Sequence, residues 1–255
     1  MRIRFLGTGG AEGIPAMGCG CAHCTRARQE GGRLIRRRSA VLFSLPGYEL
    51  LLDTPPDIKE QLETSGIREI NGIYITHEHH DHIAGLEEFL YWREGVDLFV
   101  EPGLYRKLIR ENWGTRLPEI VFHMDIHPGI GVCFNSFSIV PFEVRHAVPC
   151  FGLELKEDHL RVVHGADSDI RFSNYARSVI AGTDLLILNT PFFESREGES
   201  HLSVQEAIAL KEELGVKRLV LTHFNHINRL HDELEEYFSR FEGIIAAYDG
   251  LCIEV

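Results

Sequence analysis

The sequence predicts an α/β protein in which two β-sheets lie between layers of helices, an αββα sandwich. Strand patterns open the chain, return between residues 120 and 163, and on each occasion give way to alternating helix and strand patterns. Two β-rich halves that carry helices outside can bury their apolar faces by packing sheet against sheet. The 255 residues contain no linker, short repeat or low-complexity tract, so we expect one domain over 1–255.

The first half of the chain is expected to alternate between short strands and helices. Apolar, β-branched runs predict strands at 2–6, 39–45, 49–52, 72–75 and 97–100. Helical spacing predicts helices at 57–65, 86–93 and 103–112. Residues from Gly7 to about Arg38 are expected to form an irregular loop, which at this length usually has a function or an internal brace.

The second half is expected to begin with strands and then to alternate. Strands are predicted at 137–140, 151–155, 160–163, 185–188 and 218–221, and helices at 172–181, 203–214 and 231–241. A terminal hairpin is expected after the last helix.

Composition and charge exclude several classes of protein. The 44% hydrophobic and 25% charged content is typical of a soluble globular protein. No apolar run approaches a membrane span and no signal-peptide pattern precedes the first strand, so we expect a cytoplasmic protein without a membrane partner. The net charge of -12 argues against a nucleic-acid partner. A small phosphorylated partner is compatible with that charge, and homodimerisation stays open.

The segment Thr76-His77-Glu78-His79-His80-Asp81-His82 is the strongest functional signal. It joins an apolar strand to a predicted helix. Alternate side chains of an extended chain point the same way, so His77 and His79 can bind one cation together. Asp81 and His82 then lie toward a second cation. A polar surface loop is the alternative, but the spacing H-x-H-x-D-H is much rarer than a single pair of histidines.

Other candidate ligands follow apolar strands elsewhere in the chain. They are His146, Asp167 and His223. Each alone is more often a structural residue, but three at the same kind of position are unlikely to be coincidental.

Together these residues resemble the metallo-β-lactamase superfamily over essentially the whole chain. The resemblance implies the αββα fold and two divalent metal ions, Zn²⁺ or Mn²⁺. It assigns the first metal to His77, His79 and His146, the second to Asp81, His82 and His223, and both to Asp167. Asp53 then supports the site from behind, and Asp53 and Asp81 count among the catalytic residues. A turn or helix-capping role is an equal alternative for Asp53.

A cysteine-rich loop at about 15–38 indicates a further zinc ion. Without a secretion signal, the cluster Cys19-Gly20-Cys21-Ala22-His23-Cys24 favours metal binding over disulfides. Reduced thiols on a loop are the alternative. The opening from Phe5 to Pro15 resembles the phosphodiesterase-like members of the superfamily, including tRNA 3′-processing nucleases and cyclic phosphodiesterases. The cysteine cluster resembles the phosphoribosyl 1,2-cyclic phosphate phosphodiesterases of the carbon–phosphorus lyase pathway. The second resemblance implies a structural zinc held by Cys19, Cys21, Cys24 and His226, a closed type of site.

The same resemblance makes His201 the residue that binds substrate phosphate and protonates the leaving oxygen, which requires a pKa near neutrality. A surface histidine that caps a helix is the alternative. Arg36, Arg37 and Arg38 are expected to be a solvated charge run, with phosphate binding as the less favoured option. His80, His123, His127, His159, His164 and His231 have no spacing that assigns them a role.

The expected function is that of a metal-dependent phosphodiesterase. It would hydrolyse phosphoribosyl 1,2-cyclic phosphate or a 2′,3′-cyclic nucleotide by a metal-bridging hydroxide. The alternatives are hydrolysis of a thioester, a lactone, a β-lactam or a tRNA 3′ end, and a non-hydrolytic role like that of the pyrroloquinoline quinone biosynthesis protein. The pair Phe192-Phe193 departs from the serine-bearing segment expected near the substrate of the phosphoribosyl enzyme.

Overall fold

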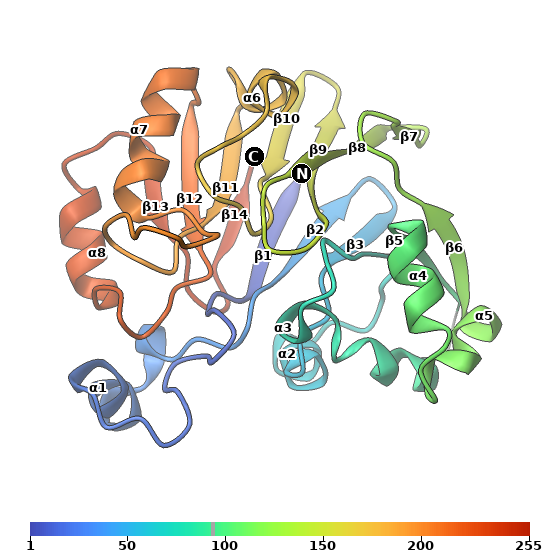
Figure 1. Cartoon of the computed structure of the whole chain (residues 1–255), viewed down its shortest axis with the longest axis horizontal. Helices are drawn as coiled ribbons and strands as arrows, with labels where there is room; N and C mark the ends of the chain where they lie inside the picture. Colours follow the sequence, from blue (N-terminus) through green and yellow to red (C-terminus); the bar gives the residue numbers. More distant parts are fainter. Residues whose placement is uncertain (93–94) are drawn as a thin grey trace.

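Two seven-stranded sheets pack face to face in this computed structural model, which describes residues 1–92 and 95–255 (Figure 1). In spatial order the first sheet consists of β14 (Cys252–Glu254), β1 (Arg2–Gly7), β2 (Ala40–Leu45), β3 (Tyr48–Leu52), β4 (Gly72–Tyr74), β5 (Val96–Val100) and β6 (Val121–Asp125). The second consists of β13 (Ile244–Ala246), β12 (Arg218–Thr222), β11 (Leu185–Asn189), β10 (Leu160–His164), β9 (Cys150–Glu157), β8 (Phe137–Val144) and β7 (Val132–Cys133).

Helices cover the outer faces of both sheets, which confirms the predicted sandwich. The first sheet carries α2 (Ile58–Ser65), α3 (His80–Ile83), the 3₁₀ helix η2 (Leu86–Tyr91), α4 (Pro102–Leu108), η3 (Gly114–Arg116) and α5 (Leu117–Ile120). The second carries α6 (Asn174–Ile180), α7 (Val204–Leu214) and α8 (His231–Phe238). The N-terminal loop contains α1 (Ala22–Glu30) and η1 (Gly32–Leu34), and α1 lies beside the two sheets in Figure 1.

Alternation of side chains along the strands explains the layers. On β3, Leu50 and Leu52 enter the core between the two sheets, whereas Leu51 enters the core under the helices of the first sheet. Successive side chains of a strand face opposite sides. Both faces of β3 are therefore buried, and its sequence is a continuous apolar run.

Parallel strands bring the carboxyl ends of several strands to one edge of the sandwich. β3, β4 and β5 are parallel in the first sheet, and β10, β11, β12 and β13 are parallel in the second. Ligands in such sheets gather where strands end. The candidate ligands follow strand ends at this edge, in loops or, for Asp81 and His82, on α3.

Apart from shifted helix ends, as at α4, three predicted elements differ from the structure. The expected irregular loop contains α1, because the Cys21 side chain caps that helix by accepting from the amide of Cys24. The expected terminal hairpin is wrong, since β13 pairs with β12 and β14 pairs with β1 in the other sheet. The helix expected at 86–93 is the shorter η2, and residue 93 lies outside the described residues.

The two terminal strands join different sheets because they differ in pattern. Ile244 and Ala246 are buried in a short apolar run that suits a parallel strand. On β14 only Ile253 is buried between two exposed neighbours, which is typical of a strand with one solvated face.

No helix within residues 1–92 and 95–255 combines the length and apolar character needed to cross a membrane.

Candidate metal centre

The backbone bends sharply where three strands deliver candidate residues. Asp53 has a φ of 63° directly after β3, His223 has a φ of 59° directly after β12, and Ala166 has a φ of 48° just before Asp167. Left-handed backbone at residues other than glycine costs about 1–3 kcal/mol and often occurs at functional sites. The three bends therefore mark this edge as a candidate site.

His77, His79 and His146 form the first group of donors. Nε2 of His77 lies 3.0 Å from Nδ1 of His79, and Nε2 of His146 lies 3.1 Å from the same atom. The three ligand atoms lie within 4.8 Å of one another. This spacing suits a single cation bound by three imidazoles.

Asp81, His82 and His223 form the second group, and all three are buried. Oδ2 of Asp81 lies 3.3 Å from Nε2 of His82 and 3.4 Å from Nε2 of His223. Asp81 and His82 both lie on the short helix α3, and His223 lies in the loop directly after β12.

Asp167 lies between the two groups. Its Oδ2 is 3.3 Å from Nε2 of both His82 and His223, and 3.9 Å from Nε2 of His77. The structure thus brings all seven predicted ligands together, with Asp167 next to members of both groups. We call this set the histidine–aspartate centre: His77, His79, Asp81, His82, His146, Asp167 and His223.

Hydrogen bonds outside the centre determine which ring nitrogen of each histidine faces it. His146 Nδ1 donates to the carbonyl oxygen of Ser200 at 3.1 Å, which leaves the lone pair on Nε2. His77 Nδ1 lies 2.9 Å from the hydroxyl of Thr76, which itself donates to Asp53 at 2.9 Å. His77 Nδ1 is then the donor, so Nε2 carries its lone pair. Such outer partners orient metal-binding histidines and raise their basicity.

Asp53 organises this support. Its Oδ2 accepts from Nδ1 of His82 at 2.7 Å, and its Oδ1 accepts from the amide of Thr76 at 2.8 Å. The helix-capping alternative for Asp53 is wrong, because Asp57 occupies the N-cap position of α2. Asp53 acts through His82 and Thr76, so its expected place among the catalytic residues becomes a positioning role.

Charges within the centre favour anionic aspartates. Burial acts to raise the pKa of Asp167, but His223 and His82 outweigh burial and hold that pKa well below its ordinary value. The pKa of Asp81 is lowered in the same way: burial opposes the shift, and the nearby rings of His223 and His82 produce it. The centre therefore presents two carboxylates as anions near neutral pH.

The donor set fits divalent metal ions. In the described part of the chain, Nε2 of His82 and Nε2 of His223 are buried without a hydrogen-bond partner. They lie close to Asp81 and Asp167, but not with hydrogen-bond alignment. Such groups are arranged around a shared space rather than paired with each other. Imidazole and carboxylate ligands suit Zn²⁺ or Mn²⁺.

The second predicted cluster also forms. We call it the cysteine cluster: Cys19, Cys21, Cys24 and His226, whose ligand atoms lie within 4.8 Å of one another. All six cysteines of the chain are free thiols. The amide of Cys24 and the ring of His226 lower the pKa of Cys21 to about 6, which favours the thiolate that binds zinc. A set of three cysteines and one histidine fits a closed zinc site.

His201 lies against both groups of the centre. Its ring centroid is 5.0 Å from that of His146 and 5.4 Å from that of His223. The helix-capping alternative is wrong, because Ser203 caps α7. Burial lowers the pKa of His201 to about 4. The expected pKa near neutrality is therefore also wrong, and His201 is a neutral imidazole at pH 7.

The three arginines do not face the centre. Arg36 is buried and donates to the Thr8 hydroxyl at 2.7 Å and to the Ala247 carbonyl at 2.6 Å. Arg37 pairs with Glu60 and Arg38 with Asp57. Both expected roles, solvated charge run and phosphate binding, are wrong for Arg36, which instead ties the N-terminal loop to the C-terminal segment.

Sequence reasoning missed two residues beside the centre. His164 is buried at the end of β10 and lines, with Asp167 and His223, a cavity of about 10 Å³ behind the ligands. Burial lowers its pKa to about 3, so it is neutral. Asn189 ends β11 and contacts His201. Position at a strand end was the available signal for both.

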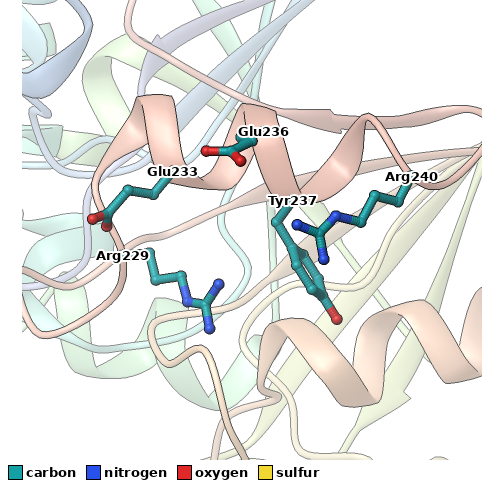
Figure 2. A pocket seen from close by; sticks show the side chains of 5 residues that line it. All are labelled: Arg229, Glu233, Glu236, Tyr237 and Arg240. Carbon is teal, nitrogen blue, oxygen red and sulfur yellow. The ribbon is translucent and has the colours of Figure 1, made fainter.

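A pocket elsewhere on the surface offers no comparable chemistry. Figure 2 shows this cavity of about 210 Å³ along α8, lined by Arg229, Glu233, Glu236, Tyr237 and Arg240. It contains neither histidine nor cysteine. Arg229 stacks on Phe193 at 3.5 Å, and Phe193 also contacts Tyr237 of α8, so this member of the pair that departs from the expected pattern packs toward α8.

Comparison with known proteins identifies the family. Residues 48–224 match the beta-lactamase superfamily domain. The chain belongs to the metallo-β-lactamase superfamily. The family predicted from the sequence is therefore confirmed, and proteins of this superfamily bind divalent metals and are mostly metal-dependent hydrolases.

Relatives of known name fall into different functional groups. An octanoyltransferase of Porphyromonas gingivalis is 27% identical over 98% of this chain and 51% of its own length, so this chain spans about half of that relative. A ribonuclease Z of Methanopyrus kandleri is 23% identical over 99% of this chain and 97% of its own length.

Solved structures show the same fold. A diphosphatase of the PhnP family has a TM-score of 0.84 at 24% identity and covers 100% of this chain and 97% of its own. Zinc-bound PqqB from Methylobacterium extorquens has a TM-score of 0.88 at 21% identity and covers 100% of both chains.

Proposed function

We propose that this chain is a metal-dependent phosphodiesterase whose substrate is a small cyclic phosphodiester of the phosphoribosyl 1,2-cyclic phosphate or 2′,3′-cyclic nucleotide type. The observation that carries the proposal is the position of His201. It lies against His146 and His223, one residue from each donor group, and is not needed to complete either group.

The residues around the centre have separate tasks. His77, His79 and His146 would hold one divalent ion, Asp81, His82 and His223 a second, and Asp167 both. Two such ions supply Lewis-acid activation of the phosphoryl group and of the attacking water.

His201 is neutral because it is buried, so it offers an N–H to a phosphate or leaving oxygen rather than a full positive charge. Asp53 keeps His82 and Thr76 in place and thereby keeps the donors aligned.

Several features favour a small phosphodiester over the alternatives. The names of the ribonuclease Z relative and of the PhnP-family diphosphatase denote hydrolysis at phosphorus by proteins similar to this chain, which supports a phosphorus-containing substrate. The net charge of -12 disfavours tRNA. All seven donor positions are present, which favours hydrolysis over the non-hydrolytic role suggested by the PqqB neighbour.

The test is hydrolysis of bis(p-nitrophenyl) phosphate, then of the two cyclic substrates, by protein loaded with Zn²⁺ or Mn²⁺. We expect His201→Ala to lose about 100-fold in kcat with full metal content, since removal of one hydrogen-bond donor to the developing charge costs about 10²–10³. His80→Ala is the matched control, because His80 is exposed within the same segment and should keep wild-type activity. Fully metal-loaded wild type that hydrolyses no phosphodiester would contradict the proposal.

A thioester is the second candidate substrate. The octanoyltransferase relative supports it, because this chain matches about half of that protein. Octanoyl thioesters of coenzyme A and of a carrier protein are the probes. A kcat/KM for either thioester that exceeds the kcat/KM for every phosphodiester would favour thioester hydrolysis.

A further inference from the structure

Asn189 holds the ring of His201. Its Nδ2 lies 2.7 Å from Nδ1 of His201. Asn189 is 2% exposed at the end of β11, so water does not compete for the amide. The loop that carries His201 is fixed by the same neighbourhood, since the amide of Leu202 donates to the carbonyl of Ser168 at 2.9 Å.

The backbone of Ser168 determines how the Asn189 amide is oriented. The amide nitrogen of Ser168 can only donate, and it lies 3.1 Å from Oδ1 of Asn189. Oδ1 therefore faces Ser168, and the NH₂ group faces His201. Ser168 follows Asp167 directly, so the orientation of Asn189 is tied to the centre itself.

The donor on Asn189 determines where His201 carries its proton. An NH₂ group can only donate, so Nδ1 of His201 must accept and is unprotonated. Asp167 does not compete for Nδ1, because its Oδ2 is 3.9 Å away, beyond hydrogen-bond distance. An imidazole whose Nδ1 accepts this hydrogen bond can carry its ring proton only on Nε2.

We propose that Asn189 is a positioning residue that keeps His201 in the Nε2–H tautomer, so that His201 meets the phosphoryl group of the substrate as a hydrogen-bond donor. The proposal rests on the proposed phosphodiesterase function only for the identity of the group that accepts this hydrogen bond. Among the described residues, the hydrogen bond of the His201 ring is made by Nδ1 and none by Nε2, which leaves Nε2 available to a ligand.

The tautomer is measurable without substrate. Nitrogen NMR of the full-length protein loaded with zinc, with ¹⁵N-labelled histidine and His201→Gln to assign the signals, separates protonated from bare ring nitrogens. We expect His201 to show a bare Nδ1 and a protonated Nε2. A protonated Nδ1 in the wild type would overturn the proposal, even if no variant at Asn189 folds.

Asn189→Asp tests the consequence. The carboxylate keeps the shape but accepts a hydrogen bond, so we expect Nδ1 of His201 to become protonated. A disfavoured tautomer in a catalytic histidine is costly, and we expect kcat to fall about tenfold or more with KM nearly unchanged. Wild-type kcat and an unchanged His201 spectrum in this variant would overturn the positioning role.

Asn228→Asp is the matched control. Asn228 is also buried, and its amide donates to the Thr190 carbonyl at 2.9 Å, one residue from Asn189, without contacting His201. The Asn228→Asp variant should leave the His201 spectrum unchanged. If the wild type cleaves no phosphodiester but shows the bare Nδ1, the proposed function fails and the positioning role of Asn189 stands. If the wild type is active but Asn189→Asp changes neither kcat nor the His201 spectrum, the proposed function stands and the positioning role fails.

Discussion

The histidine–aspartate centre and the cysteine cluster differ in what holds them. The centre draws its residues from strand ends of both sheets, and Asp53, Thr76 and Ser200 fix its ring nitrogens from outside. The cysteine cluster takes three ligands from one loop and packs on a small core of Ile14, Ala27 and Leu34. A set of four ligands is complete in itself. The centre, in contrast, places His201 beside its donors, as a reactive site requires.

The two clusters are neighbours along one loop. His223 of the centre and His226 of the cysteine cluster are separated by Phe224 and Asn225. The amide of Phe224 donates to the Thr8 carbonyl at 2.9 Å, and the amide of Gly10 donates to the Phe224 carbonyl at 3.0 Å. The comparison therefore predicts that damage to the centre abolishes activity, whereas damage to the cysteine cluster mainly lowers stability.

The largest effect is expected from Asp167→Asn, which keeps the shape and removes the charge shared by both donor groups. We expect activity to fall at least about 10³-fold, because the metal pair supplies several kcal/mol and each 1.36 kcal/mol is worth tenfold. Elemental analysis should show that the centre loses metal while the zinc content of the cysteine cluster is unchanged. Asp158→Asn, which removes a carboxylate charge at an exposed position outside the centre, is the control. Wild-type metal content and activity in Asp167→Asn would contradict the assignment.

A smaller effect is expected from Asp53→Asn. Asparagine tolerates the left-handed backbone at this position, but it lacks the charge that orients His82. Loss of such an outer partner typically weakens metal affinity about 10- to 100-fold. Competition with a chelator measures the affinity. If the centre binds zinc as tightly as in the wild type, Asp53 does not support it.

The smallest effect on activity is expected from Cys21→Ser. We expect one zinc equivalent to be lost and Tm to fall by about 5 °C, which corresponds to about 2 kcal/mol in a chain of this size. We expect kcat to change only a few-fold, because both sheets keep their own cores. Cys133→Ser, an exposed cysteine outside the cluster, is the control. Complete loss of activity in Cys21→Ser would show that the two clusters are not separable.

The sequence was sufficient to predict the donors and the fold because both depend on local patterns. The spacing from His77 to His82 places four donors on one short segment, and apolar strands end just before His146 and His223. Parallel strands deliver their carboxyl ends to one edge. Strand prediction and spacing therefore bring these side chains to one edge, and the family resemblance assigns each of them to a metal.

The residues that were missed depend on distant neighbours. Asn189 ends a predicted strand, but its role follows from the orientation that Ser168 imposes and from the approach of His201. The low pKa of His201 comes from burial, which the sequence around it does not reveal. Arg36 resembles part of a surface charge run in the sequence, but in the structure it is buried and donates to the carbonyl of Ala247 in the C-terminal segment.

The pairing of β1 with β14 has a topological consequence. Arg2 is opposite Glu254, and the N-terminal amine lies 3.4 Å from the Val255 carbonyl, so the two chain ends are adjacent (Figure 1). β1 is antiparallel to β2 and β2 to β3, so both ends lie at the edge opposite the one where β3 delivers Asp53. A short linker would join them in a circular permutant, and a module fused to either end would leave access to the histidine–aspartate centre unobstructed.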